Sequence, residues 1–257
     1  MLERELRRIE KCQEKLRSKA GQPAPKWRQQ LESRVPEKVY SSLEAAFAKG
    51  FAIVFEKGES IISKSFDKDK LLEQHLLKDS ELRSFGRRRE LKRFIKTAEQ
   101  SSRANMGITT ISGIGLGALG IGLPDIVLFL ATLLRGIYQT AQSYGFDYKS
   151  SSEQMLILEM MAASLSRGED RLYWEQRVQQ RLEDPAAVKE EELGLQIRQT
   201  ASVFAVDMLV LKFIQGMPLV GLIGGISDPV YYKKVMDNVK LIYRKRYLLA
   251  LCANNIL

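Results

Sequence analysis

The sequence predicts an all-α protein, a helical bundle in which two glycine-rich apolar helical hairpins pack together. Apolar residues recur at helical spacing, as Val39, Leu43 and Phe47 do, and this three-to-four period is typical of a helix with one buried face. Two apolar segments, 106–137 and 201–232, each contain several glycines and an acidic corner with a proline. No β-alternation surrounds the first of them, so we expect helices there rather than strands.

Residues 1–34 are predicted to form a charged N-terminal helical extension, and residues 35–257 a single all-α domain. The stretch 2–19 mixes charges around a thin apolar stripe, a pattern typical of a solvated helix with Glu/Arg pairs. Its start has no apolar run, so we expect no signal peptide. Two cysteines at opposite ends, Cys12 and Cys252, favour a reducing compartment. We therefore expect a cytoplasmic protein.

The positive charge lies in the N-terminal part of the chain. Residues 1–103 hold 25 basic and 16 acidic side chains, whereas residues 104–257 hold 15 of each. The sharpest cluster lies between residues 86 and 96, where Leu91, Phe94 and Ile95 share one helical face. Its basic members are Arg87, Arg88, Arg89, Lys92, Arg93 and Lys96.

Basic side chains beside an apolar face suit an anionic membrane surface. We therefore expect these six residues to contact the inner face of the cell membrane. The alternative is that they form the solvated face of a core helix. No nucleic-acid-binding motif and no interleaved aromatic groove accompany them, so no nucleic-acid partner is expected.

The first glycine-rich segment is predicted to be a hairpin of helices 106–122 and 124–143. Gly113 and Gly117 stand four apart and Gly120 lies near the same face, a spacing that lets two helix backbones approach closely. Pro124 cannot continue the preceding helix but suits the first turn of the next. Asp125 would then meet the free N–H groups of that turn.

Three interpretations of this segment compete. The glycines formally match a dinucleotide-binding fingerprint, but that motif needs a strand before it and a continuing helix after it. The hairpin could be buried in the core of a soluble helical protein, or it could insert into the surface of a membrane. A transmembrane hairpin is disfavoured, because spanning needs about 20 apolar residues per helix and the second arm has nine before Arg135.

The remaining elements are predicted in order. Gly145 is expected to cap the end of the helix that begins at Pro124, and serines at 150–152 to cap the next. Residues 155–165 are nearly all apolar, with Glu159 as their one charged residue, which predicts a central buried helix. Residues 169–193 are strongly charged and are expected to be exposed.

The second glycine-rich segment repeats the plan of the first. Gly221 and Gly225 stand four apart after Pro218, and Asp228 precedes a proline at the corner. A final helix is predicted from this corner to about residue 251.

Three stretches together resemble the EcsC protein family. They are the run GIGLGALGIGLPDI at 113–126, the Tyr144-Gly145-Phe146-Asp147 that follows its second helix, and the run PLVGLIGG at 218–225. Their order and spacing agree over about residues 35–250. The resemblance implies a mainly bacterial family named after a gene beside those of an ABC transporter that affects exported proteins. It makes Tyr144, Gly145 and Asp147 family-motif residues and implies no reaction.

We expect a non-enzymatic, membrane-associated helical protein, an accessory factor to a membrane complex such as an ABC transporter or secretion system. The alternative is a soluble helical module that binds an apolar or lipid-like ligand between its glycine-rich hairpins. An enzyme using aspartates at 125, 147, 207 or 228 is the third hypothesis, but no paired-carboxylate or His-based metal motif is present. No catalytic residue, metal or cofactor is therefore expected.

Overall fold

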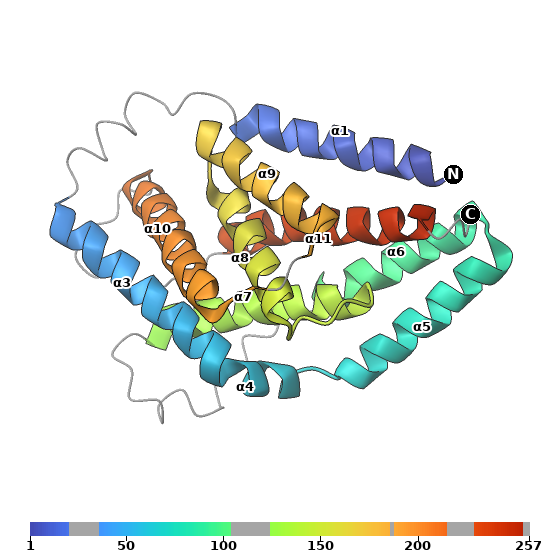
Figure 1. Ribbon diagram of the computed structural model, residues 1–257, viewed down its shortest axis with the longest axis horizontal. Coiled ribbons are helices and arrows are strands. Elements are labelled where there is room, and N and C mark those ends of the chain that lie inside the picture. The colour runs from blue at the N-terminus through green and yellow to red at the C-terminus, as the bar shows by residue number, and fades with distance from the viewer. Residues whose placement is uncertain (21–35, 104–123, 186–187, 215–228, 254–257) are drawn as a thin grey trace.

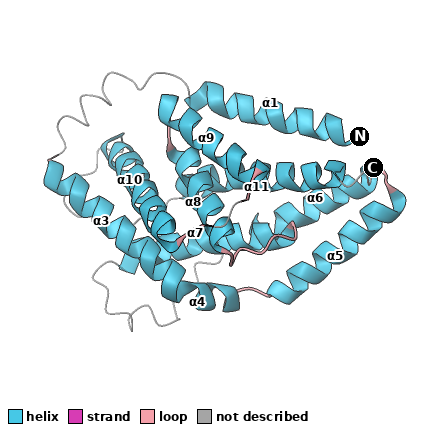
Figure 2. Cartoon of the chain, in the orientation of Figure 1, coloured by secondary structure: helices cyan, strands magenta, loops and turns pink. Residues whose placement is uncertain are grey.

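The computed structural model describes residues 1–20, 36–103, 124–185, 188–214 and 229–253. Every regular element within these ranges is a helix, and the predicted all-α class is confirmed. Figure 2 shows the helices joined by loops and turns. No helix in this part of the chain combines the length and the apolarity needed to cross a bilayer.

The described helices follow one another along the chain and are labelled in Figure 1. They are α1 (Leu2–Ala20), α3 (Glu37–Ile53), the π-helical turn η1 (Val54–Gly58), α4 (Glu59–Lys64), α5 (Lys68–Phe85), α6 (Arg88–Arg103), α7 (Pro124–Ser143), α8 (Ser151–Leu165), α9 (Gly168–Glu183), α10 (Glu190–Ile214) and α11 (Pro229–Ala253).

Helix α8 lies at the centre of the bundle, as its all-round apolarity predicts. Residues 155–165 are all buried, and α9, α10 and α11 pack around them. The helix begins where predicted, because the Ser150 hydroxyl accepts a hydrogen bond from the Glu153 N–H at 3.2 Å. A short polar side chain thus satisfies one of the free donors at the helix start.

Helix α3 packs against α10 and α7, and its contact with α10 uses aromatic side chains. Phe47 and Phe51 each place their ring 5.4 Å from the Phe204 ring, measured between centroids. All three side chains are fully buried, so the three-to-four spacing in α3 reports core packing.

Two isolated glycines allow neighbouring helices to approach closely. A Cβ at Gly50 of α3 would lie 2.9 Å from Cγ2 of Ile126 in α7. A Cβ at Gly136 of α7 would lie 2.3 Å from the Tyr232 hydroxyl and 3.3 Å from the Met236 sulfur, both in α11. These two close helix contacts therefore use glycines other than the pairs at four-residue spacing that the sequence singled out.

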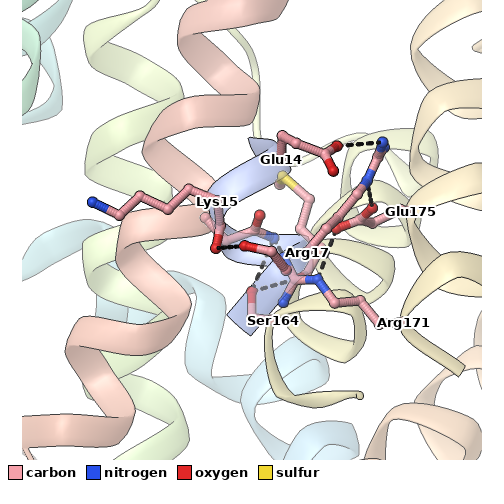
Figure 3. A network of polar contacts seen from close by, with 9 residues as sticks. Glu14, Lys15, Arg17, Ser164, Arg171 and Glu175 are labelled. Carbon is pink, nitrogen blue, oxygen red and sulfur yellow. Dashed lines mark hydrogen bonds and ion pairs between the residues drawn. The ribbon is translucent and has the colours of Figure 1, made fainter. Parts of the chain in front are cut away.

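Helix α1 packs along α11 and touches α9, so it is less solvated than its composition predicts. Leu2 and Ile9 are buried. Arg17 pairs with Glu175 of α9, which also accepts from Arg171 at 2.8 Å (Figure 3). The predicted stripe thus faces the bundle, while the domain boundary at residue 34 stays a prediction.

Helices α5 and α6 form an antiparallel pair that packs on α7. Their connecting turn lies at one end of the molecule's longest axis (Figure 1). This arrangement brings the start of α6, where the basic cluster begins, to the edge of the bundle.

Each predicted corner proline begins a helix, Pro124 in α7 and Pro229 in α11. Asp125 lies in the first turn of α7. The arm 106–122 and the residues Gly113, Gly117, Gly120, Pro218, Gly221, Gly225 and Asp228 lie outside the described residues, so the two hairpins and their packing stay predictions.

Substituting Gly136 by alanine tests the contact between α7 and α11. The added Cβ overlaps the Tyr232 hydroxyl, so we expect a loss of about 1–3 kcal/mol in the free energy of unfolding, typical of overpacking. Gly194 of α10 is the matched control, because a Cβ there meets nothing within 4 Å. Gly194→Ala should gain up to about 1 kcal/mol from helix propensity. Equal urea midpoints for the two variants would contradict the close contact.

Candidate functional site

Helix α6 is more strongly amphipathic than the neighbouring helices α5 and α7. Leu91, Phe94 and Ile95 are buried in the core, where α6 packs against α5 and α7. The six predicted basic residues lie on the opposite side. Arg87, Arg88, Arg89, Lys92, Arg93 and Lys96 are all exposed.

The basic side chains form a surface of one sign, which we call the α6 basic face. It comprises Arg88, Arg89, Lys92, Arg93 and Lys96, which alone line a shallow groove of about 420 Å³. Within the described ranges none of them forms an ion pair, whereas arginines of α9 and α11 do. The positive charges of this face are therefore available to attract an anionic partner from solvent.

The turn before α6 is fixed by local hydrogen bonding. Gly86 adopts a left-handed conformation, with φ 60°, and its N–H donates to the Leu82 carbonyl at 2.8 Å. Leu82 is fully buried, so the end of α5 is tied to the core. Glycine adopts this conformation without the steric cost of a Cβ.

The Tyr144-Gly145-Phe146-Asp147 motif lies beneath α6. Tyr144 is buried, with its ring 5.8 Å from that of Phe94 in α6 and 5.9 Å from that of Tyr247 in α11. Phe94 and Tyr247 stack directly at 4.2 Å. This aromatic cluster joins α6 to α7 and α11 and so holds the α6 basic face in place.

Gly145 makes room for the chain's single histidine. It caps α7 with φ +81°, as predicted, and a Cβ there would lie 2.3 Å from Nε2 of His75. Nδ1 of His75 lies 3.2 Å from the Ser143 carbonyl oxygen. A carbonyl only accepts, so Nδ1 donates and Nε2 is the bare nitrogen of the neutral ring.

The other two motif residues have structural contacts. Phe146 stacks on Tyr243 of α11, and the Arg246 guanidinium lies 4.1 Å above its ring. Asp147 accepts a hydrogen bond from the Lys149 N–H at 3.1 Å. These contacts fix the loop between α7 and α8.

Two carboxylates of α8 are buried and paired with arginines. Glu159 has no exposed surface and accepts from Arg177 at 2.9 Å and from Arg181 at 3.2 Å, both in α9. Glu153 accepts from the Tyr243 hydroxyl and from Arg246, each at 2.7 Å. Burial raises the pKa of Tyr243, which keeps this hydroxyl protonated as the donor.

A second groove, of about 780 Å³, lies between α3, α9 and α10. Trp174 and Val203 contribute apolar wall, and Arg167 and Arg198 are exposed at its lining. Asp207 also lines it and pairs with Lys234 at 3.0 Å. Desolvation lowers the pKa of Lys234. Side chains of both signs therefore line this groove, unlike the α6 basic face.

The described residues contain no cluster of three or more His, Cys, Asp or Glu that could hold a metal ion. Of the four aspartates considered for an enzyme, Asp147 and Asp207 have the structural partners given above. The side chains at positions 125 and 228 lie outside the described residues.

Sequence reasoning found the α6 basic face and missed its support. The contacts of His75 with Ser143 and Gly145 join residues about 70 positions apart. No local sequence pattern predicts such contacts. A signal did exist for Glu159, because a single carboxylate in an apolar run requires a buried partner.

The sequence model of the EcsC protein family matches residues 2–248. The match includes α1 as well as the bundle. Neither a curated protein nor a solved structure matches the chain.

Substituting Gly145 by alanine should destabilise the protein by about 2–4 kcal/mol. Two costs add up: alanine would adopt a left-handed backbone conformation, and its Cβ would overlap His75. In a His75→Ala background the overlap disappears, so the same substitution should cost only about 1–2 kcal/mol. Urea unfolding of the four proteins in this double-mutant cycle measures the difference. An identical cost in both backgrounds would show that the two residues do not meet.

Acidification should weaken the fold through His75. Burial lowers the pKa of His75 below its usual value of 6.5, although Asp79 opposes the shift. The unfolded chain therefore binds the proton first, and stability is lost as pH falls below about 6.5. Urea midpoints at pH 7.5 and pH 5.5 should fall further for the wild type than for His75→Gln. Parallel falls would contradict this assignment.

Proposed function

The chain belongs to the EcsC protein family, and we propose that it is a non-enzymatic helical protein that docks on the anionic surface of a membrane. In this role it serves as an accessory factor to a membrane complex, such as an ABC transporter or a secretion system. The docking contact is the α6 basic face. The proposed location is the inner face of the cell membrane.

One observation supports this proposal most strongly: five basic side chains line a single groove, and none forms an ion pair within the described residues. Juxtaposed like charges repel one another, and an approaching anion relieves that repulsion. A surface of anionic lipids offers many such charges at once, and each Lys or Arg near it contributes about 1 kcal/mol.

The burial of the apolar face of α6 indicates which side chains would contact the membrane. An amphipathic helix that enters a bilayer uses its apolar face, but Leu91 and Phe94 of α6 are already in the core. The proposed docking therefore leaves the bundle folded and relies on the outward cations. Such a contact weakens as salt rises, because it is screened.

The accessory role follows from the gene context that the family resemblance implies. The α6 basic face would bring the bundle to the membrane surface, where such a complex lies.

Neutralising part of the α6 basic face should reduce membrane binding. Arg88→Gln, Lys92→Gln and Lys96→Gln together remove three exposed charges. At about 1 kcal/mol each, their loss should weaken binding to vesicles with anionic lipid by roughly 100-fold. Co-sedimentation with vesicles of phosphatidylcholine and phosphatidylglycerol measures this.

The matched control removes the same charge from α1. Arg4, Lys11 and Lys15 are also exposed, so Arg4→Gln, Lys11→Gln and Lys15→Gln give a protein of equal net charge. This control should bind nearly as the wild type does. Equal weakening of the two triple variants would show that net charge matters and the α6 basic face does not.

A further inference from the structure

Phe85 is the last residue of α5, and its side chain is 61% exposed. No large apolar side chain among the described residues is more exposed. We propose that Phe85 is a membrane anchor, which enters the acyl-chain boundary of an anionic bilayer while the adjoining arginines contact the headgroups. This inference rests on the proposed function and assigns it a second, apolar contact.

The backbone around Phe85 presents the ring on a fixed support. Leu82 is fully buried three residues earlier, and its carbonyl accepts from the Gly86 N–H at 2.8 Å. Gly86 ends the helix in a left-handed conformation. The ring therefore does not depend on a loose loop for its position, and little ordering is needed when it inserts.

The turn also lies where a flat surface can reach it. It stands at one end of the longest axis of the molecule (Figure 1). Arg87, Arg88 and Arg89 follow Phe85 after one residue and are exposed. An exposed aromatic ring and three exposed cations thus lie close together in the chain at the tip of the α5–α6 pair.

The charges at this tip favour a lipid surface as the occupant. Between residues 85 and 96 there are six basic side chains and one acid, Glu90. A ring flanked by cations matches the interface of an anionic bilayer, where headgroups supply negative charge and the acyl boundary accepts apolar side chains. Inserting the ring adds a contribution that salt does not screen, because it depends on apolar area.

The size of this contribution follows from the area rule. The free energy gained grows with the apolar area removed from water, so partial insertion of the ring should strengthen binding about tenfold. The α6 basic face then determines how binding depends on lipid charge. Phe85 contributes the share of the binding affinity that remains at high salt.

Leu77 provides a matched control within α5. It is 57% exposed and lies eight residues from Phe85, which is about 12 Å along the helix. We would measure binding of wild type, Phe85→Ala and Leu77→Ala to vesicles of phosphatidylcholine and phosphatidylglycerol. Phe85→Ala should bind about tenfold more weakly, and Leu77→Ala as the wild type does. Circular dichroism checks that each variant keeps its helices.

A second measurement locates the side chain directly. Phe85→Trp and Leu77→Trp are each mixed with vesicles whose acyl chains carry bromine, which quenches nearby indole fluorescence. The signal of Phe85→Trp should be quenched, and that of Leu77→Trp should match the small change of the wild type. Equal signals from the two positions would overturn the anchor.

The two proposals fail separately. If Phe85→Ala binds as the wild type does while the triple variant at positions 88, 92 and 96 loses binding, the anchor is wrong and the basic surface stands. If that triple variant binds as tightly as the wild type, the proposed function fails whatever Phe85 does.

Discussion

Two buried carboxylates in α8 determine how the surrounding helices must lie. Glu159 is fully buried and Glu153 nearly so, and an unpaired charge in such a place would be strongly destabilising. Glu159 is paired through Oε1 with two arginines of α9, and Glu153 is paired with a tyrosine and an arginine of α11. Helices α9 and α11 therefore have to present these faces to α8, and the bundle is arranged around that requirement.

The basic side chains that meet this requirement contrast with those of the α6 basic face. Those of α9 and α11 that pair with α8 act inside the protein, whereas those of the α6 basic face have no such partner within the described residues. The aromatic cluster of Tyr144, Phe94 and Tyr247 links the two regions. Motif residues in the core thereby fix the orientation of a charged surface that they do not themselves form.

Much of the framework could be predicted from the sequence because local signals define it. The start of α7 at Pro124, the Ser150 cap and the buried α8 all follow from a few neighbouring residues, as do the two sides of α6. The contacts between distant helices could not be predicted. Gly136 has no repeated spacing to mark it, and its role depends on Tyr232. The pairing of α1 with α11 through Glu5 and Arg244 joins opposite ends of the chain.

The central claim is that the α6 basic face contacts an anionic bilayer. Lysine acetylation, followed by mass spectrometry with and without vesicles containing phosphatidylglycerol, tests it most directly. The account predicts that Lys92 and Lys96 become protected on the vesicles, while Lys11 and Lys15 of α1, which are also exposed, react as before. Unchanged modification of Lys92 and Lys96, or equal protection of the lysines of α1, would contradict it.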